Sequence, residues 1–96
     1  EGPVWHGAQL FQEKGCINCH SLAKNGGRRG PDLTYVGDRL HKDNLTIRIN
    51  MGGVNMPPYA GSLTADEVRD LVAFLETRKK KEGATGEDTM IRMQKP

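Results

Sequence analysis

Apolar residues recur at helical spacing near the start of the chain. In the stretch VWHGAQLFQEKG, Val4, Ala8 and Phe11 stand at positions i, i+4 and i+7, so they share one face of a helix. Gly15 comes just after this pattern, and a glycine there is typical of a helix end. The pattern predicts an amphipathic helix over residues 3 to 14.

A second apolar stripe predicts a helix near the other end of the chain. Thr64 and Glu67 have the spacing of a capping box, in which each side chain bonds to the backbone N–H of the other residue. The helix is predicted to run to about Arg78, because the lysines that follow suit the negative end of a helix dipole. Its apolar positions are Val68, Leu71, Val72 and Leu75, with Phe74 beside them.

Between these two helices, glycine and proline divide the chain into shorter segments. The stretch SLAKNGGRRGPD predicts a loop, and a short helix is predicted around residues 34 to 40. KDNLTIRINMGG predicts a further helix, which the pair Gly52-Gly53 would stop. The following VNMPPYAGS predicts a rigid extended loop, because a residue that precedes proline disfavours helical geometry.

Both cysteines lie in the segment CINCH, in which His20 directly follows the second one. A structural zinc site needs four protein ligands, and the remaining candidates, His6 and His41, lack finger-like spacing. A thioredoxin-like redox pair would follow a strand, whereas a helix is predicted before Cys16. C-x-x-C-H is the local signature of c-type haem attachment. We therefore predict one covalent haem c, with Cys16 and Cys19 as thioether anchors and His20 as the proximal iron ligand.

The composition bears on the size of the core. The chain has 96 residues, which suffice for one small domain. Leu, Ile, Val and Phe supply 19 of them, a fraction at which a chain can fail to build a core. The net charge is only +2, unlike that of a disordered polyelectrolyte. A buried porphyrin would supply a large part of the apolar interior.

Several features of the sequence bear on the location of the protein in the cell. No stretch approaches 18 consecutive apolar residues, so we do not expect the chain itself to span a membrane. It begins at Glu1 without a basic and apolar leader, so we expect a removed signal peptide or a domain cut from a longer protein. Haem attachment to C-x-x-C-H takes place outside the cytoplasm in bacteria, which predicts a periplasmic or other extracytoplasmic location. Residues 83 to 96 predict a polar tail or linker.

The order of these motifs is more specific than any one of them. A helix, C-x-x-C-H, a Gly-Pro-x-Leu loop (GPDL), a Met-Pro loop (NMPP) and a final helix together resemble the class I c-type cytochromes over residues 4 to about 78. The resemblance implies an all-α fold, with crossed terminal helices and with short helices and loops wrapped around one haem. Gly7, Phe11 and Phe74 are similar to the contact at which the family's terminal helices cross. The cytochrome c domain is accordingly expected to span residues 1 to 82.

The same resemblance implies further haem contacts. The carbonyl of Pro31 would accept a hydrogen bond from the His20 imidazole. Leu33 would line the haem, and Arg39 would meet a haem propionate. The compact form is similar to haem domains that belong to, or serve, respiratory oxidases and quinol:cytochrome c reductases. Alternative propionate donors, which more often only cover the haem edge, are Tyr59, Tyr35 and Trp5.

The sixth iron ligand decides whether a haem carries electrons or reacts with small molecules. Met56 lies in the Met-Pro loop, where the following prolines fix the backbone, and we predict that its thioether binds the iron. His6 and His41 have small or polar neighbours and are predicted to face solvent. The other methionines, one at a helix end and two in the predicted tail, are Met51, Met90 and Met93.

We therefore predict an electron-transfer protein, not an enzyme, which passes single electrons between respiratory-chain partners through a His/Met-ligated haem. A haem enzyme or gas sensor with an open or labile sixth site is an alternative. No His and Arg pair suited to peroxide chemistry is visible near the Met-Pro loop, which argues against it. A haem domain from a larger respiratory complex subunit is a further alternative.

Charge suggests the kind of partner. Between positions 14 and 30 the chain carries basic residues and no acid, which is typical either of a solvated loop or of a docking rim. As a rim, it would attract redox partners with acidic docking surfaces, such as a terminal oxidase or a quinol:cytochrome c reductase. We expect a monomer or a tethered domain and no nucleic-acid partner. The residues concerned are Lys14, Lys24, Arg28 and Arg29.

Overall fold

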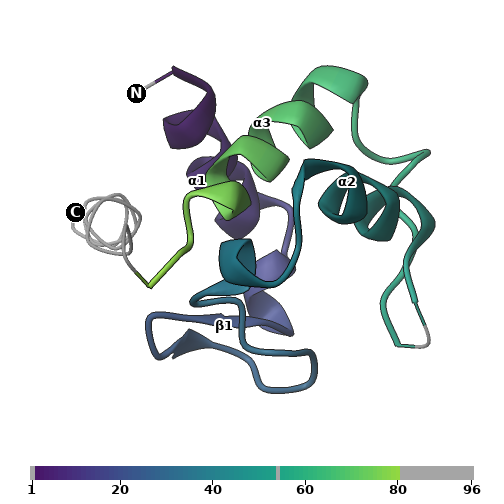
Figure 1. Cartoon of the computed structure of the whole chain (residues 1–96). Coiled ribbons are helices and arrows are strands. Elements are labelled where there is room, and N and C mark those ends of the chain that lie inside the picture. The colour runs from purple at the N-terminus through teal and green to yellow at the C-terminus, as the bar shows by residue number, and fades with distance from the viewer. Residues whose placement is uncertain (1, 54, 81–96) are drawn as a thin grey trace.

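Helices supply most of the regular structure in the computed structural model, which describes residues 2–53 and 55–80 (Figure 1). This content confirms the all-α prediction, while the predicted tail at 83–96 lies outside the described residues. The α-helices are α1 (Gly2–Glu13), α2 (Lys42–Met51) and α3 (Ala65–Glu76). Between them lie the 3-10 helices η1 (Cys16–Asn18) and η2 (Val36–Asp38) and the strands β1 (Ser21–Leu22) and β2 (Asn25–Gly26).

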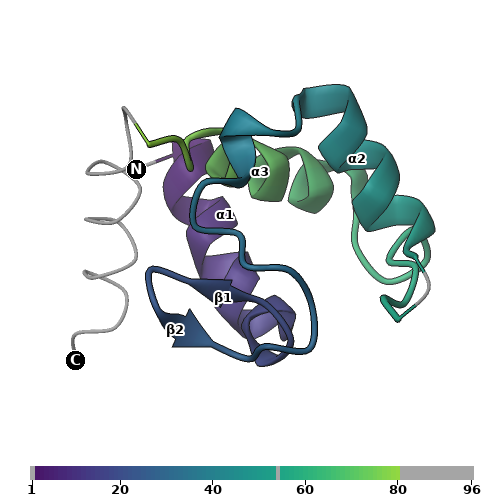
Figure 2. The same ribbon diagram turned by 60° about the horizontal axis from the view of Figure 1, so that its bottom comes forward.

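Helices α1 and α3 cross in close contact (Figures 1 and 2). The close approach depends on Gly7, because a Cβ atom there would collide with the backbone carbonyl of Asp70 and lie 2.7 Å from the Cβ atom of Phe74. Beside the glycine, the rings of Phe11 and Phe74 pack with centroids 6.1 Å apart and planes tilted by 57°. The predicted contact between the terminal helices is confirmed.

The hydrophobic core is built mainly on the contact of α3 with α1 and α2. Leu45 and Ile49 are the buried residues of α2, and their i and i+4 spacing turns one face of that helix inward. The apolar stripe predicted for α3 is buried as well. The core consists of Ala8, Leu10, Phe11, Leu22, Val36, Leu45, Ile49, Leu63, Val68, Leu71, Val72, Phe74 and Leu75.

The start of α3 is fixed by the predicted capping box. The Thr64 hydroxyl accepts a hydrogen bond from the Glu67 N–H at 3.1 Å, and the Glu67 carboxylate accepts one from the Thr64 N–H at 2.9 Å. The bond from the Thr64 backbone is the main reason that the pKa of Glu67 lies below its usual range. The two bonds satisfy backbone donors that have no partner within the helix.

The end of α3 differs from the prediction. The helix stops at Glu76, and the Thr77 hydroxyl donates to the Phe74 carbonyl at 2.6 Å as the chain turns inward. Arg78 is then completely buried, and its Nε–H donates to the Thr34 carbonyl at 3.1 Å. The Arg78 carbonyl accepts a bond from the Gly37 N–H at 2.8 Å. The segment after α3 therefore holds η2 and the loop before it in place.

His6 contributes to the helix crossing, so the prediction that it simply faces solvent is incomplete. Its side chain is 45% exposed, but its Nδ1–H donates to Asp70 Oδ2 at 2.7 Å. This hydrogen bond is the largest cause of the lowered pKa of Asp70, and Arg69 adds to it. His6 thus joins α1 to α3. His41 is exposed, as predicted, and lies directly before α2.

The segment predicted as a loop contains a small hairpin. Strands β1 and β2 pair antiparallel, with Ser21 opposite Gly26. Ala23 and Lys24 form the turn with φ angles of 53° and 69°, the positive values that a tight hairpin turn with a matching twist needs. Within residues 2–53 and 55–80, no helix combines the length and apolar character needed to cross a membrane.

The helix crossing gives a first prediction. Replacing Gly7 with alanine should lower the free energy of unfolding by about 1–3 kcal/mol, because the added methyl group overpacks the contact with α3. Chemical denaturation followed by far-UV circular dichroism measures the change. Gly61→Ala is the matched control, since a Cβ atom at Gly61 has no neighbour within 4 Å. Equal stability of the two variants would show that α1 and α3 do not meet at Gly7.

Candidate haem site

The two cysteines lie on a single tight turn directly after α1. Gly15 adopts a left-handed conformation with a φ angle of 84°, which ends the helix and redirects the chain into η1. The N–H groups of Cys19 and His20 both donate to the Cys16 carbonyl, at 3.2 and 3.0 Å. Both thiols are free and half-buried. The turn therefore holds two thiols and an imidazole close together, as thioether attachment to one porphyrin requires.

The imidazole of His20 has one nitrogen committed and the other available. Its Nδ1–H donates to the Pro31 carbonyl at 2.8 Å, the bond that the sequence resemblance implied. That bond selects the tautomer in which Nε2 carries a lone pair for a metal ion. Gly30 packs against the ring, since a Cβ atom there would lie 2.6 Å from His20 Cε1. The Gly30 N–H also donates to the Cys19 carbonyl at 2.7 Å.

The residue after Pro31 is held by side chains. The hydroxyls of Ser21 and Thr34 donate to the same carboxylate oxygen of Asp32, at 2.7 and 2.8 Å. The bond from Ser21 is the largest cause of the lowered pKa of Asp32, and Thr34 and Arg39 lower it further. Asp32 is therefore a carboxylate at neutral pH.

Arg39 makes a contact that the sequence did not suggest. Its Nη2–H donates to the backbone carbonyl of Asp32 at 3.1 Å, and its side chain is exposed. The guanidinium thus braces the same loop that carries Pro31. Its contact with a haem propionate remains a prediction.

The Met-Pro loop folds back on the end of α2. The N–H groups of Tyr59 and Ala60 donate to the carbonyls of Ile49 and Asn50, at 3.0 and 3.2 Å, and so satisfy acceptors that have no partner within the helix. Gly52 allows this approach, because its φ angle is 74° and a Cβ atom there would lie 2.5 Å from the Met56 carbonyl. The backbone around Met56 is thereby fixed relative to α2.

Tyr59 in this loop and Cys16 in the cysteine turn are both partly buried, and burial shifts the pKa of each. Burial raises the pKa of the Tyr59 phenol, and negative charge on Cys16 and Cys19 would raise it further. Burial likewise raises the pKa of the Cys16 thiol to about 11, so the free thiol is protonated at neutral pH. Partly buried side chains of the Met-Pro loop and of the C-x-x-C-H turn pack against the same hydrophobic core, although the two segments are far apart in the sequence.

The side chains of the cysteine turn, the proline loop and the Met-Pro loop fit a haem. Partly buried apolar side chains from the cysteine turn, the proline loop and the Met-Pro loop all pack against the edge of the core. Two free thiols, one imidazole with a free nitrogen and one thioether form a donor set suited to covalent haem with His and Met ligands. The partly buried side chains concerned are Cys16, Ile17, Leu33, Leu40, Met56 and Tyr59.

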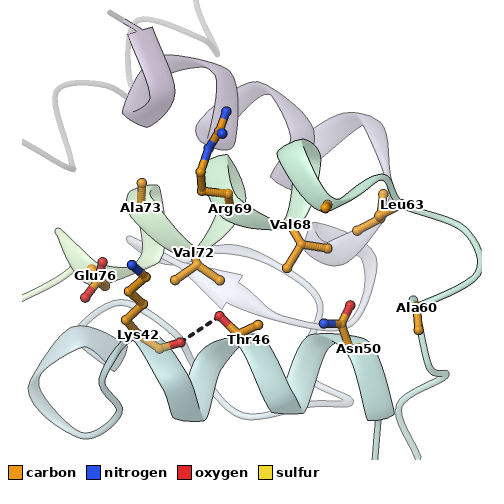
Figure 3. A pocket seen from close by; sticks show the side chains of 11 residues that line it. Lys42, Thr46, Asn50, Ala60, Leu63, Val68, Arg69, Val72, Ala73 and Glu76 are labelled. Atoms are coloured by element: carbon orange, nitrogen blue, oxygen red, sulfur yellow. Dashed lines mark hydrogen bonds between the residues drawn. The ribbon is translucent and has the colours of Figure 1, made fainter.

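A groove of about 570 Å³ lies elsewhere, between α2 and α3 (Figure 3). Its walls carry Thr46 and Asn50 from α2 and Val68 and Val72 from α3. The residues predicted to bind haem do not line this groove. The groove is therefore a separate feature from the candidate haem site.

The fold and this arrangement of cysteines and histidine define a c-type cytochrome. Residues 3–75 match the family model described as cytochrome c oxidase, cbb3-type, subunit III, and the chain belongs to that family. A c-type cytochrome of this kind carries covalently bound haem c with its iron, so haem c is the cofactor of this chain.

Two individual proteins are similar to the chain. Cytochrome c oxidase subunit 2 of Alkalihalophilus pseudofirmus is 27% identical over 85 residues, which cover 76% of this chain and 25% of that protein. The chain thus spans about a quarter of the length of this relative. The crystal structure of the c-type cytochrome SorU from Sinorhizobium meliloti matches with a TM-score of 0.68 and 24% identity, over 80% of this chain and 93% of that one. At this identity, the likeness shows the fold.

Of the residues predicted from the sequence, the structure joins the two cysteines, His20 and Pro31 by hydrogen bonds, and further residues that were not predicted support them. Gly30, Ser21, Asp32 and Thr34 were not predicted to take part. The sequence held one signal, since Ser21 directly follows the histidine and Asp32 directly follows the proline. The iron contact of Met56 and the haem contacts of Leu33, Arg39 and Tyr59 remain predictions.

The packing of Gly30 gives a second prediction. Gly30→Ala should displace the His20 ring, lower the free energy of unfolding by about 1–3 kcal/mol and change the absorption spectrum of the oxidised haem protein. Denaturation and absorption spectroscopy measure the two effects. Gly61→Ala again serves as control. A variant with wild-type spectrum and stability would contradict the close contact between Gly30 and the imidazole.

Proposed function

We propose that the chain transfers single electrons through a haem ligated by His20 and Met56. The observation that carries this proposal is the hydrogen bond from His20 Nδ1–H to the Pro31 carbonyl, because it leaves Nε2 of the same ring available to the iron. The bound haem supplies the redox chemistry, since its iron alternates between the ferric and ferrous states. The protein supplies attachment, axial ligands and a partly apolar surrounding.

Support for Met56 comes from its loop. Met56 is half-buried at the edge of the core, and the bonds from Tyr59 and Ala60 to α2 fix the backbone that follows it. Met51 is 71% exposed at the end of α2, which suits a surface residue better than a ligand. A thioether held by a rigid loop stabilises the ferrous form and raises the reduction potential. This favours a carrier over an enzyme or gas sensor with an open sixth site.

The partners that we propose are respiratory. The family is named after an oxidase subunit, and the relative from Alkalihalophilus pseudofirmus is named cytochrome c oxidase subunit 2. We infer an extracytoplasmic carrier or tethered haem domain that exchanges electrons with a terminal oxidase or a quinol:cytochrome c reductase. Which of these partners it meets depends on its docking surface.

The docking surface that we propose is a basic rim of Lys24, Arg28 and Arg29, all exposed in the hairpin turn and the loop that follow the cysteine turn in the sequence. Lys14, the fourth predicted member, lies 3.9 Å from the Glu67 carboxylate, so part of its charge is compensated. The rim is therefore smaller than the sequence suggested. Such a patch on a chain of net charge +2 favours transient encounter with an acidic surface.

The choice of Met56 is testable by spectroscopy. In the oxidised protein, Met56→Ala should abolish the weak absorption band near the red edge that reports sulfur-to-iron charge transfer, and it should lower the reduction potential. Met51→Ala should leave both unchanged. Loss of the band in Met51→Ala would identify the other methionine as the ligand. A wild-type protein without the band would favour an open sixth site.

The basic rim predicts a dependence on salt. The second-order rate of electron exchange with an acidic respiratory partner should fall by about tenfold as ionic strength rises to physiological values, where the screening length is about 8 Å. Changing Lys24 and Arg28 to glutamate should slow the low-salt rate and leave the absorption spectrum unchanged. Changing Lys42 and Lys80 to glutamate alters the net charge equally and is the control. A flat salt dependence would favour a covalently tethered partner.

A further inference from the structure

Three hydrogen bonds connect the segment that follows the cysteine turn with the loop that follows Gly30. In each bond the two residues are 11 positions apart, so the two segments run alongside each other in a fixed register. Only the first of these bonds involves the imidazole. The pairs, which we call the proximal ladder, are His20 with Pro31, Ser21 with Asp32, and Ala23 with Thr34.

Asp32 is the centre of this ladder. Its Oδ1 atom accepts hydrogen bonds from Ser21 at 2.7 Å and from Thr34 at 2.8 Å. The Thr34 hydroxyl in turn accepts a bond from the Ala23 N–H at 3.0 Å. One carboxylate oxygen therefore ties the loop to the residue next to His20 and, through Thr34, to the start of the hairpin turn. Charge-assisted bonds of this kind are stronger than neutral ones.

The backbone at Asp32 is also held by hydrogen bonds. Arg39 donates to the Asp32 carbonyl at 3.1 Å, and the next N–H, that of Leu33, donates to the Ser21 carbonyl at 2.8 Å. The Pro31 carbonyl belongs to the same rigid peptide plane as the Asp32 nitrogen. Whatever fixes Asp32 therefore fixes the direction in which the Pro31 carbonyl points.

We propose that Asp32 is a positioning residue, which sets the hydrogen bond between Pro31 and His20 and thereby the donor strength of the proximal imidazole. The inference rests on the proposed function, in which His20 Nε2 binds the iron. A strong bond to Nδ1–H makes the imidazole a better donor and favours ferric iron. Weakening the ladder should therefore raise the reduction potential.

The experiment uses the haem-loaded protein and separates hydrogen bonding from charge. Ser21→Ala and Thr34→Val each remove one hydroxyl and keep the Asp32 charge. Asp32→Asn removes the charge and keeps an acceptor oxygen, whereas Asp32→Ala removes both. Thr46→Val is the control for a lost hydroxyl, since Thr46 donates to the Lys42 carbonyl within α2. Asp43→Asn is the control for a lost surface charge.

Reduction potential, exchange of the His20 Nδ1–H proton by ¹⁵N NMR and free energy of unfolding are measured for each variant. We expect Ser21→Ala, Thr34→Val and Asp32→Ala to raise the ratio of ferrous to ferric protein at a fixed potential severalfold. A tenfold change corresponds to 59 mV for one electron. The Nδ1–H proton should exchange faster in these variants. Asp32→Asn should shift less than Asp32→Ala, because it keeps an acceptor oxygen and loses only the charge assistance. Both controls should stay near the wild type.

Two results would overturn the proposal. Lower stability in Ser21→Ala and Thr34→Val with unchanged potential and unchanged proton exchange would mean that the ladder only supports the fold. A shift in Asp32→Asn as large as in Asp32→Ala, with none in Ser21→Ala, would mean that charge alone acts. If Asp32→Ala does not take up haem, the potentials and proton exchange of Ser21→Ala and Thr34→Val test the proposal by themselves. Failure of the proposed function shows separately, because the wild type would then lack the sulfur-to-iron band.

Discussion

The hydrogen bond between His20 and the Pro31 carbonyl is the interaction around which the candidate haem site is arranged. It joins the cysteine turn to the loop 30–34, and it assigns one ring nitrogen to the protein and leaves the other for iron. Gly30 lets the loop backbone lie against the ring, and Asp32 fixes the peptide that carries the acceptor. The position of the axial ligand is thus set by backbone and neighbouring side chains together.

The rest of the described chain holds in place the two segments that this bond joins. Gly7 allows α1 and α3 to cross closely, and α1 leads directly into the cysteine turn. The buried Arg78 joins the segment after α3 to Thr34, one residue beyond the Gly-Pro-x-Leu loop. The helix crossing and the proximal loop are therefore parts of one connected structure. A haem on the partly buried edge would complete the apolar interior, since burial of apolar surface is the dominant stabilising term.

Local sequence signals predicted the helices well, because capping and periodicity are decided by residues close together in the chain. Thr64 and Glu67 are three positions apart, and their capping box formed as expected. The end of α3 and the bond from His6 to Asp70 were not foreseen, because they depend on partners 44 and 64 positions away. The role of Asp32 was missed because Ser21 lies 11 positions away, and the adjacency of Ser21 to His20 and of Asp32 to Pro31 was not used as a signal.

The ligand set itself is tested most directly by ¹⁵N NMR of protein whose three histidines are labelled. We expect that His20 alone shows a paramagnetically shifted Nε2 in the ferric protein, together with a slowly exchanging Nδ1–H proton. His6 and His41 should keep the spectra of ordinary imidazoles. A paramagnetic shift on the nitrogens of a second histidine, or iron binding through Nδ1 of His20, would contradict this ligand set.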